Sequence, residues 1–395
     1  MKKILILSSN ETGHGHKSIA EALYERLSPH AEVEIVEAFR LLGRVGVKAG
    51  RMYGPITRLG PDFWKLIWET SYNRPDTVDQ LMSSLLHDRF MHRLKADPPN
   101  LIVTVHPNFN GSVINVIKEH KIKIPFITLL ADLVDIHPTW VDKRADWIMC
   151  PSEESYSAAL MYGAVHSRLK LCGFPTRARF TDAARAAERN PYTGGRPLEC
   201  LLMSGGEGSG NLLKLSLALL SHFNCRVTVI CGRNKRLQNS LTEKLSEYGE
   251  RARVLGFCEN IQDYMLAADI AFMRGSPNSV MEAVVCNTPL IVTGALSGQE
   301  ARNPEFVLMK GLGVICRQSA KLRPLISGLL ENGSEGLNRI AEKQRTYRKF
   351  DSAEEIAGFI LSKTPEKPPV IPDFDLRHPI MYQAAELYRR MEKKQ

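Results

Sequence analysis

The sequence predicts an α/β chain built from two doubly wound domains. Short apolar runs of strand length alternate with amphipathic helical segments, a pattern typical of parallel sheets covered by helices. The 395 residues are more than one ordinary core accommodates. A segment rich in Arg, Ala, Pro and Gly divides the alternation into two series. We therefore expect two similar halves with a cleft between them.

The first half is expected over residues 1–180. Ile19, Ala20, Leu23 and Leu27 share one face of a helix over 18–27. The apolar runs predict strands at 3–8, 33–36, 101–105, 124–130, 147–150 and 169–172.

A linker is expected over 181–197, and a second βα series over 198–365. Its predicted strands cover 198–203, 226–231, 254–257, 270–273 and 289–293. A Pro-rich break at 365–372 precedes a charged amphipathic segment. We expect that segment to form a terminal helix over 378–395, which packs back on the first half.

Composition narrows the possible partners and the compartment. The net charge of +9 indicates an acidic partner, such as nucleic acid, an anionic membrane or phosphate-bearing substrates. The eight cysteines form no C-x-x-C pair, which favours buried, reduced thiols. No apolar run has the length of a membrane span, and the run after Met1-Lys2-Lys3 is too short for a signal peptide. We expect a bacterial cytoplasmic protein.

Ligands of doubly wound sheets bind beyond the carboxyl ends of the strands, so functional residues are expected in the loops that follow strands. The loop over 10–16 contains Gly13, His14, Gly15 and His16. Its glycines allow close backbone approach to a ligand, and His16 at the helix start could accept a proton from a hydroxyl. A glycine-dependent turn or a His-x-His metal pair are the alternatives, and no Cys or carboxylate cluster supports a metal.

The loop after the run 124–130 combines a carboxylate, a histidine and a tryptophan. Asp132 could orient or deprotonate a nucleophile, with His137 and Trp140 nearby in sequence. His106 ends the preceding strand in a similar His-Pro pair. A purely structural role is the alternative for each of these histidines.

Three loops of the second half follow strands in the same way. The loop 204–211 is rich in glycine and suits phosphate or sugar contact, although its spacing is not the dinucleotide fingerprint. In the loop 274–283, Glu282 could accept hydrogen bonds from a ribose diol, or it could form a capping box with Ser279. The polar loop 297–303 could bind sugar hydroxyls or phosphate, or simply begin a solvated helix.

The segment 39–68 carries six basic residues, five aromatic residues and one acid. Interleaved basic and aromatic side chains suit the headgroup layer of an anionic membrane. A nucleic-acid groove or an ordinary basic surface would give a similar pattern.

Taken in order, these motifs resemble those of the monogalactosyldiacylglycerol synthases and processive diacylglycerol glucosyltransferases. Both are related to MurG-type enzymes with the GT-B fold. The resemblance runs from residue 3 to about residue 313. The first matching motif is the glycine-rich His loop at 12–16. The other matching motifs lie, in order, at 105–107, 132–140, 205–208, 229–234, 256–257 and 298–303.

The resemblance implies that the second half binds the UDP-sugar donor and the first half binds the lipid acceptor. It implies His16 or Asp132 as the base. The implied donor residues are Gly206, Glu207, Gly208, Arg233, Phe257, Arg274, Ser279, Glu282, Gln299, Glu300 and Asn303. The implied acceptor residues are Gly13, His14, Gly15, His106, His137 and Trp140. The basic and aromatic composition of the segment 39–68 adds Arg44, Lys48, Arg51 and Trp64 as residues that contact the membrane.

One loop departs from the family pattern. The donor loop of the family usually reads Lys-x-Gly-Gly/Pro-Gly-Thr, whereas this chain has Arg274-Gly275-Ser276-Pro277-Asn278-Ser279. Pro277 has no amide to donate to a diphosphate. This departure therefore bears mainly on the choice of the donor sugar, and less on activity itself.

The resulting expectation is an inverting transferase with two Rossmann-like domains. It would move a hexose, galactose favoured over glucose, from a UDP-sugar to the 3-hydroxyl of 1,2-diacylglycerol. We expect no cofactor, no metal and no nucleic-acid partner, and peripheral attachment of the cytoplasmic protein to an anionic membrane. The alternatives are a UDP-sugar epimerase or hydrolase of the same fold, and a non-catalytic lipid- or nucleotide-binding relative.

Overall fold

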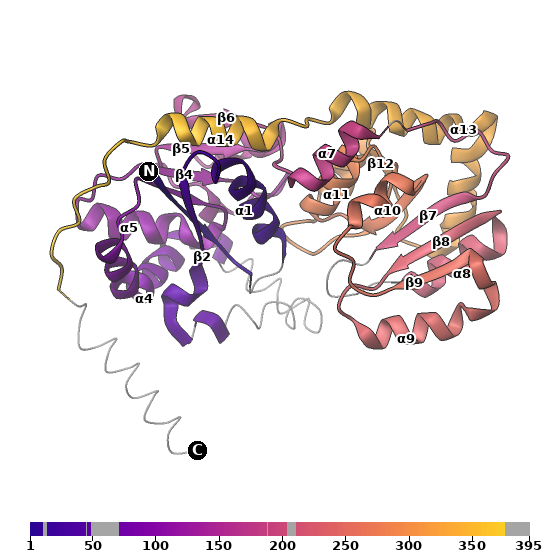
Figure 1. Ribbon diagram of the computed structural model, residues 1–395, viewed down its shortest axis with the longest axis horizontal. Helices are drawn as coiled ribbons and strands as arrows, with labels where there is room; N and C mark the ends of the chain where they lie inside the picture. The colour runs from indigo at the N-terminus through magenta and orange to yellow at the C-terminus, as the bar shows by residue number, and fades with distance from the viewer. Residues whose placement is uncertain (11–13, 45, 49–70, 188, 204–210, 376–395) are drawn as a thin grey trace, which may run out of the picture.

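The computed structural model consists of two parallel six-stranded sheets, each flanked by helices, lying side by side (Figure 1). It describes residues 1–10, 14–44, 46–48, 71–187, 189–203 and 211–375. The α/β class and the two doubly wound units expected from the alternation of apolar runs are confirmed.

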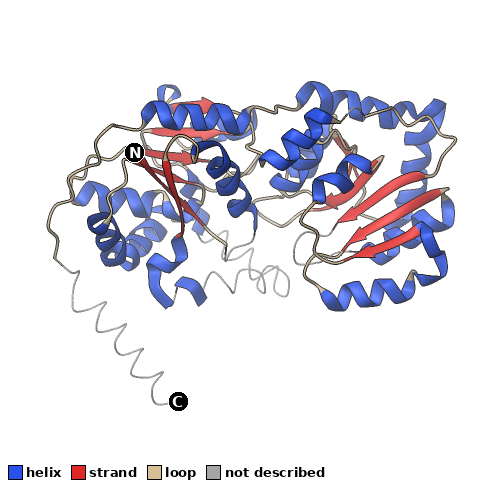
Figure 2. Cartoon of the chain, in the orientation of Figure 1, coloured by secondary structure: helices blue, strands red, loops and turns tan. Residues whose placement is uncertain are grey.

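The first sheet has the order β2-β1-β3-β4-β5-β6. Its central strands β1, β3 and β4 are buried along their whole length because helices cover both faces of the sheet (Figure 2). The order reverses between β1 and β3, which opens a crevice at their carboxyl ends. The strands are β1 Lys3–Ser8, β2 Glu32–Glu37, β3 Leu101–Thr104, β4 Phe126–Leu129, β5 Trp147–Cys150 and β6 Leu169–Leu171.

Helices α1 (His14–Leu27), α4 (Pro75–Ala96), α5 (Gly111–Glu119) and α6 (Glu153–Met161) belong to this half. Phe39, which we had grouped with the membrane-facing aromatics, is instead buried. Its ring packs edge-on against His106 and Phe109, at centroid distances of 5.3 and 5.2 Å. The prediction for Phe39 was therefore wrong, because this residue closes the core beneath the crevice.

The second sheet has the order β12-β11-β10-β7-β8-β9, and its own reversal lies between β7 and β10. The strands are β7 Leu198–Met203, β8 Cys225–Ile230, β9 Ala252–Leu255, β10 Ile270–Arg274, β11 Leu290–Gly294 and β12 Gly313–Ile315. The helices are α8 Leu212–His222, α9 Lys235–Lys244, α10 Ile261–Ala267, α11 Pro277–Val285, α12 Asn303–Met309 and α13 Leu322–Tyr347. The short β12 was not predicted.

The chain crosses between the halves twice. The first crossing carries α7 (Ala178–Ala186), which packs on α10 and α11. After α13 the chain returns, and α14 (Ser352–Lys363) packs on α1 with Ile356 and Ile360 fully buried (Figure 1). The return thus precedes residue 365, and the helix expected over 378–395 lies outside the described residues.

The two crossings are in contact. Gly173 has a φ of +80°, and a Cβ placed there would collide with Oγ of Ser352. Arg185 of α7 forms an ion pair with Asp351 at the start of α14. The two connections therefore form one joint between the halves.

Candidate active site

His16 lies at the reversal point of the first sheet. It stands in the first turn of α1, and its Nδ1 lies 2.6 Å from the carbonyl oxygen of Val105, directly after β3. A carbonyl only accepts, so Nδ1 carries the proton and Nε2 of the neutral ring holds a lone pair. Burial lowers the pKa of His16 to about 4, against the raising effect of the Val105 hydrogen bond. His16 is thus a neutral proton acceptor at physiological pH.

Two similar turns follow β3 and β4 and support this crevice. His106 and His137 each precede a proline and cap a short 3-10 helix, accepting from the backbone amides of Asn108 and Thr139. The rings of His16 and His106 lie 4.5 Å apart. The structural role that was the alternative for both histidines is therefore present in the fold, and His106 also buttresses His16.

Asn110 joins the two turns. Its Nδ2 donates to the carbonyl oxygen of Thr139 at 2.9 Å, and its Oδ1 accepts from Thr128 Oγ1 at 3.2 Å. Asn110 and Thr139 are buried, so these bonds are shielded from water. They hold the loop that carries Asp132 in register with the loop that carries His106.

Asp132 is buried next to this pair of turns. Its Oδ2 accepts a hydrogen bond from Trp140 Nε1 at 2.7 Å, and Trp140 is fully buried. Burial raises the pKa of Asp132 to about 7; the Trp140 hydrogen bond opposes this, while Glu300 and Asp135 add to it. Trp140 therefore orients a carboxylate that titrates near neutrality.

The electrostatic influence of Glu300 on Asp132 shows that the loop after β11 faces the loop after β4. Glu300 is buried and forms an ion pair with Arg274. Its Oε1 accepts a hydrogen bond from Arg274 Nη2 at 3.1 Å, and its Oε2 lies 3.0 Å from Arg274 Nε. Its Oε2 also accepts from the amide of Leu296 at 2.9 Å. The structure thus links Arg274 and Glu300, two of the predicted donor residues, into one polar unit.

Asn303 holds the donor loop from behind. It is fully buried, and its Nδ2 donates to the carbonyl oxygen of Gly275 at 2.8 Å. Pro277 occupies the first turn of α11, where a missing amide costs the helix nothing. Ser276 and not Ser279 is the N-cap, and no side-chain capping bond forms. The capping-box alternative for Glu282 is therefore absent.

The first glycine loop and the donor loop meet across the cleft. A Cβ at Gly15 would lie 3.0 Å from Asn278 Nδ2. Gly13, Gly206, Glu207 and Gly208 lie outside the described residues, as does the side chain of His14. The described part of the two loops nevertheless places the start of α1 opposite the start of α11.

Glu282 is buried on α11, and it is paired with a residue that sequence reasoning missed. Arg177 Nη2 donates to Glu282 Oε1 at 2.8 Å, and Arg177 Nη1 lies 3.3 Å from Glu21 Oε2 on α1. Burial raises the pKa of Glu282, and the charge of Arg177 opposes that rise. Arg177 lies just before α7 and the expected linker, in a stretch whose several basic residues gave no positional signal, so only the fold reveals this bridge between the halves.

An aromatic surface lies at the carboxyl ends of β8 and β9. The guanidinium of Arg233 stacks over the ring of Phe257, 4.5 Å from its centroid, while 52% of Phe257 remains exposed. An exposed ring at a sheet edge offers a flat face for a planar base. Both residues were predicted to bind the donor, and the structure brings them together.

A cavity of about 240 Å³ lies between the halves. Arg302 donates to Asp135 across it, from the backbone amide at 3.1 Å and from Nε at 2.5 Å. The lining residues come from four separate segments of the chain, and two of these segments lie in the loops 132–140 and 297–303 that the sequence analysis singled out. The lining is Tyr72, Val134, Asp135, Ile136, Ala158, Met161, Tyr162, Gly298 and Arg302.

The basic segment is described only in part. Arg44 and Lys48 are exposed, whereas Arg51 and Trp64 lie outside the described residues. In the part of the chain that the structure covers, no helix combines the length and apolarity needed to cross a bilayer. Membrane contact through this segment stays a prediction.

Comparison with known proteins identifies each half separately. Residues 14–176 match the monogalactosyldiacylglycerol (MGDG) synthase model, and residues 207–356 match the glycosyltransferase family 28 C-terminal domain. Monogalactosyldiacylglycerol synthase 3, chloroplastic, of Arabidopsis thaliana is 26% identical over 95% of this chain and 84% of its own. The resemblance inferred from the motifs is thus confirmed.

Solved structures establish the GT-B architecture. Acinetobacter baumannii MurG superposes with a TM-score of 0.62 at 14% identity, covering 92% of this chain and all of its own. The UDP-GlcNAc 2-epimerase of Neisseria meningitidis, bound to UDP-GlcNAc, gives 0.58 at 12% identity with the same coverage. A transferase and an epimerase therefore share this fold, and the fold alone does not select between them.

Proposed function

We propose that this chain, a GT-B glycosyltransferase related to the monogalactosyldiacylglycerol synthases, transfers a hexose from a UDP-sugar to the 3-hydroxyl of 1,2-diacylglycerol. The observation that carries the proposal is the neutral His16 at the mouth of the first sheet, opposite the donor loop. Galactose is the favoured sugar, because the curated relative is named as a galactolipid synthase.

In the proposed reaction, the diacylglycerol hydroxyl attacks the anomeric carbon of an α-linked UDP-hexose. Nε2 of His16 accepts the hydroxyl proton as the new bond forms. The bond to the diphosphate breaks on the opposite face of the sugar, so the product is the β-glycoside. Amides at the start of α11 and the Arg274 guanidinium stabilise the departing charge.

Asp132 has a supporting role in this scheme. Its carboxylate is engaged by Trp140, whose indole ring lies 6.0 Å from the His16 ring. We assign the base to His16, because its ring is neutral at physiological pH and stands opposite the donor loop. We assign Asp132 the structural role of holding Trp140 beside His16. The alternative, with Asp132 as the base, is separated by the pH experiment described in the Discussion.

The donor side of the proposal uses the second half. The diphosphate would lie at the loop 274–279, the ribose near Glu282, and the uracil on the exposed face of Phe257. Gln299, Glu300 and Asn303 lie in or behind the loop that faces Asp132 and would surround the sugar. Glu282 would exchange part of its contact with Arg177 for the ribose hydroxyls.

A product assay tests the proposal directly. The purified chain is incubated with UDP-galactose or UDP-glucose and vesicles that do or do not contain diacylglycerol. UDP release that requires diacylglycerol, together with a β-hexosyl lipid product, is the expected result. Release of UDP without diacylglycerol, or conversion of one UDP-sugar into another, would support the hydrolase or epimerase instead.

Access to a membrane lipid requires a docking surface. We propose that the segment 39–68 supplies it, because each basic residue near an anionic surface contributes about 1 kcal/mol to binding. Charge is screened within roughly 8 Å at physiological salt, so the aromatic residues would be needed to hold the protein at the surface. Flotation should require anionic vesicles and fall with salt. It should be weaker and less dependent on salt in a variant that replaces Arg44, Lys48, Arg51 and Trp64. Equal flotation under all conditions, or tighter binding of RNA, would contradict the docking surface.

A further inference from the structure

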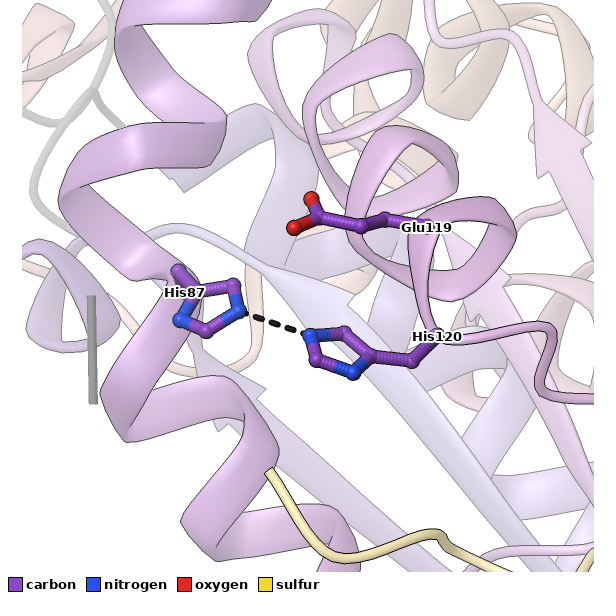
Figure 3. A group of neighbouring side chains, drawn as sticks. All are labelled: His87, Glu119 and His120. Carbon is purple, nitrogen blue, oxygen red and sulfur yellow. Dashed lines mark hydrogen bonds between the residues drawn. The ribbon is translucent and has the colours of Figure 1, made fainter. Parts of the chain in front are cut away.

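Three potential metal ligands converge where α4 packs on α5. His87 lies on α4, Glu119 ends α5 and His120 follows it (Figure 3). One ligand atom from each lies within 4.8 Å of the other two. All three side chains point toward a common centre in Figure 3. Two imidazoles and a carboxylate are a ligand set suited to Zn²⁺ and its first-row neighbours.

The protonation of His87 is fixed by its neighbour on the helix. His87 Nδ1 lies 2.7 Å from Asp88 Oδ1, and an ionised carboxylate only accepts, so Nδ1 carries the proton. The Nε2 atom of the neutral ring therefore presents its lone pair toward His120. A carboxylate behind a ligating histidine is the arrangement that orients such ligands and increases their basicity.

The spacing of the two imidazoles fits a shared ion after a small movement and after the proton that His120 Nε2 donates to His87 Nε2 moves to His120 Nδ1 or to solvent. His87 Nε2 and His120 Nε2 are 2.8 Å apart (Figure 3). Two nitrogens bound to one tetrahedral Zn²⁺ lie about 3.3 Å apart, given Zn–N bonds of about 2.0–2.1 Å. His87 is buried, while Glu119 is exposed, so the carboxylate lies on the solvent side of the cluster.

We propose that His87, Glu119 and His120 form a divalent transition-metal site that fastens α4 to α5. Water would occupy the fourth position. Phe374 covers the cluster, since its ring lies 6.2 Å from His87 and 6.3 Å from His120. The ion would thus stabilise the first half under its C-terminal segment, away from the reaction. This site is independent of the proposed transferase activity.

The test uses full-length protein, freed of any affinity tag and treated with chelator, then titrated with Zn²⁺ by calorimetry. Glu119→Gln and His120→Asn should each weaken Zn²⁺ binding at least tenfold, and Asp88→Asn should weaken it by roughly ten- to a hundredfold. His92→Asn is the matched control, because His92 also packs on Phe374, at 5.1 Å, but is not one of the three ligands.

Thermal unfolding gives a second readout that does not depend on activity. Zn²⁺ should raise the unfolding temperature of the wild type and of His92→Asn, because binding only the folded state stabilises it. The ligand variants should show little or no rise. Circular dichroism checks that each variant folds, and the exposed Glu119 provides the variant least able to disturb the core. Absence of Zn²⁺ binding in the wild type, or equal binding in all variants, would overturn the site.

Discussion

The identity of the base can be decided from the acidic limb of the pH–rate profile. His16 and Asp132 have pKa values displaced in opposite directions, to about 4 and about 7, because burial disfavours the charged form of each. A base acts only when deprotonated, so activity falls as the pH drops below its pKa. The two assignments therefore predict different profiles between pH 5 and pH 8.

The expected difference is large. At pH 5 a base with a pKa of about 7 is ionised in about one molecule in a hundred, so kcat/KM falls by about a hundredfold. A base with a pKa of about 4 remains about 90% deprotonated, so kcat/KM falls by only about a tenth. With His16 as the base, we expect a nearly flat profile from pH 8 down to pH 5.

Trp140→Phe provides the perturbation that identifies Asp132. It removes the indole donor to Asp132, whose hydrogen bond lowers the pKa of that carboxyl. A hydrogen bond to a charged group contributes about 1.5–3 kcal/mol, which corresponds to a rise of about one to two pKa units. If Asp132 were the base, the acidic limb would move upward by that amount.

The assay measures UDP release against diacylglycerol vesicles at several pH values, and kcat/KM is used because it reports the free enzyme. His16→Gln should lower turnover strongly at every pH while UDP affinity is retained. If the kcat/KM of the wild type falls off below about pH 7, and this fall-off shifts to higher pH in Trp140→Phe, then His16 is refuted as the base and Asp132 is supported.

Three further predictions concern the donor side and the closure of the halves. Glu282→Ala should weaken UDP binding at least tenfold, about 1.4 kcal/mol, by calorimetry, whereas an equal loss in the control Glu21→Ala would mean that both act only through Arg177. Phe257→Ala should weaken UDP binding by roughly tenfold or more through lost base stacking, and pyrophosphate binding should be unchanged; a parallel loss for pyrophosphate would exclude stacking. Asp135→Arg or Arg302→Asp alone should raise KM, and the double variant that exchanges the two charges should restore it. An unchanged KM in the single variants would show that the pair has no role in closure.

Much of the fold was predictable because the strands are buried on both faces. Runs such as 147–150 and 270–273 are apolar without interruption, and they lie in β5 and β10. The three-residue β12 was missed because Gly313 and two apolar residues carry too short a pattern. The return of α14 to the first half was also missed, since an amphipathic helix does not specify which sheet it covers.

The site was predictable wherever a loop follows a strand, and unpredictable wherever two loops meet. His16, Asp132 and Glu300 each stand in such a loop, and the fold brings their loops to the cleft. Arg177 and Arg302 act on partners more than a hundred residues away, at Glu282 and Asp135. The metal cluster was hidden for the same reason, because α4 and α5 bring its histidines together from distant positions.

The paired crossings at Gly173 and Ser352 have a mechanical consequence. Two connections that touch at one place hold the halves together there, so any relative motion of the halves should be smallest at this joint. Opening would then separate the end that carries Arg302 and Asp135 while the joint stays closed. Entry to the cleft and exit from it would then lie on the side of the Arg302–Asp135 ion pair, away from the joint.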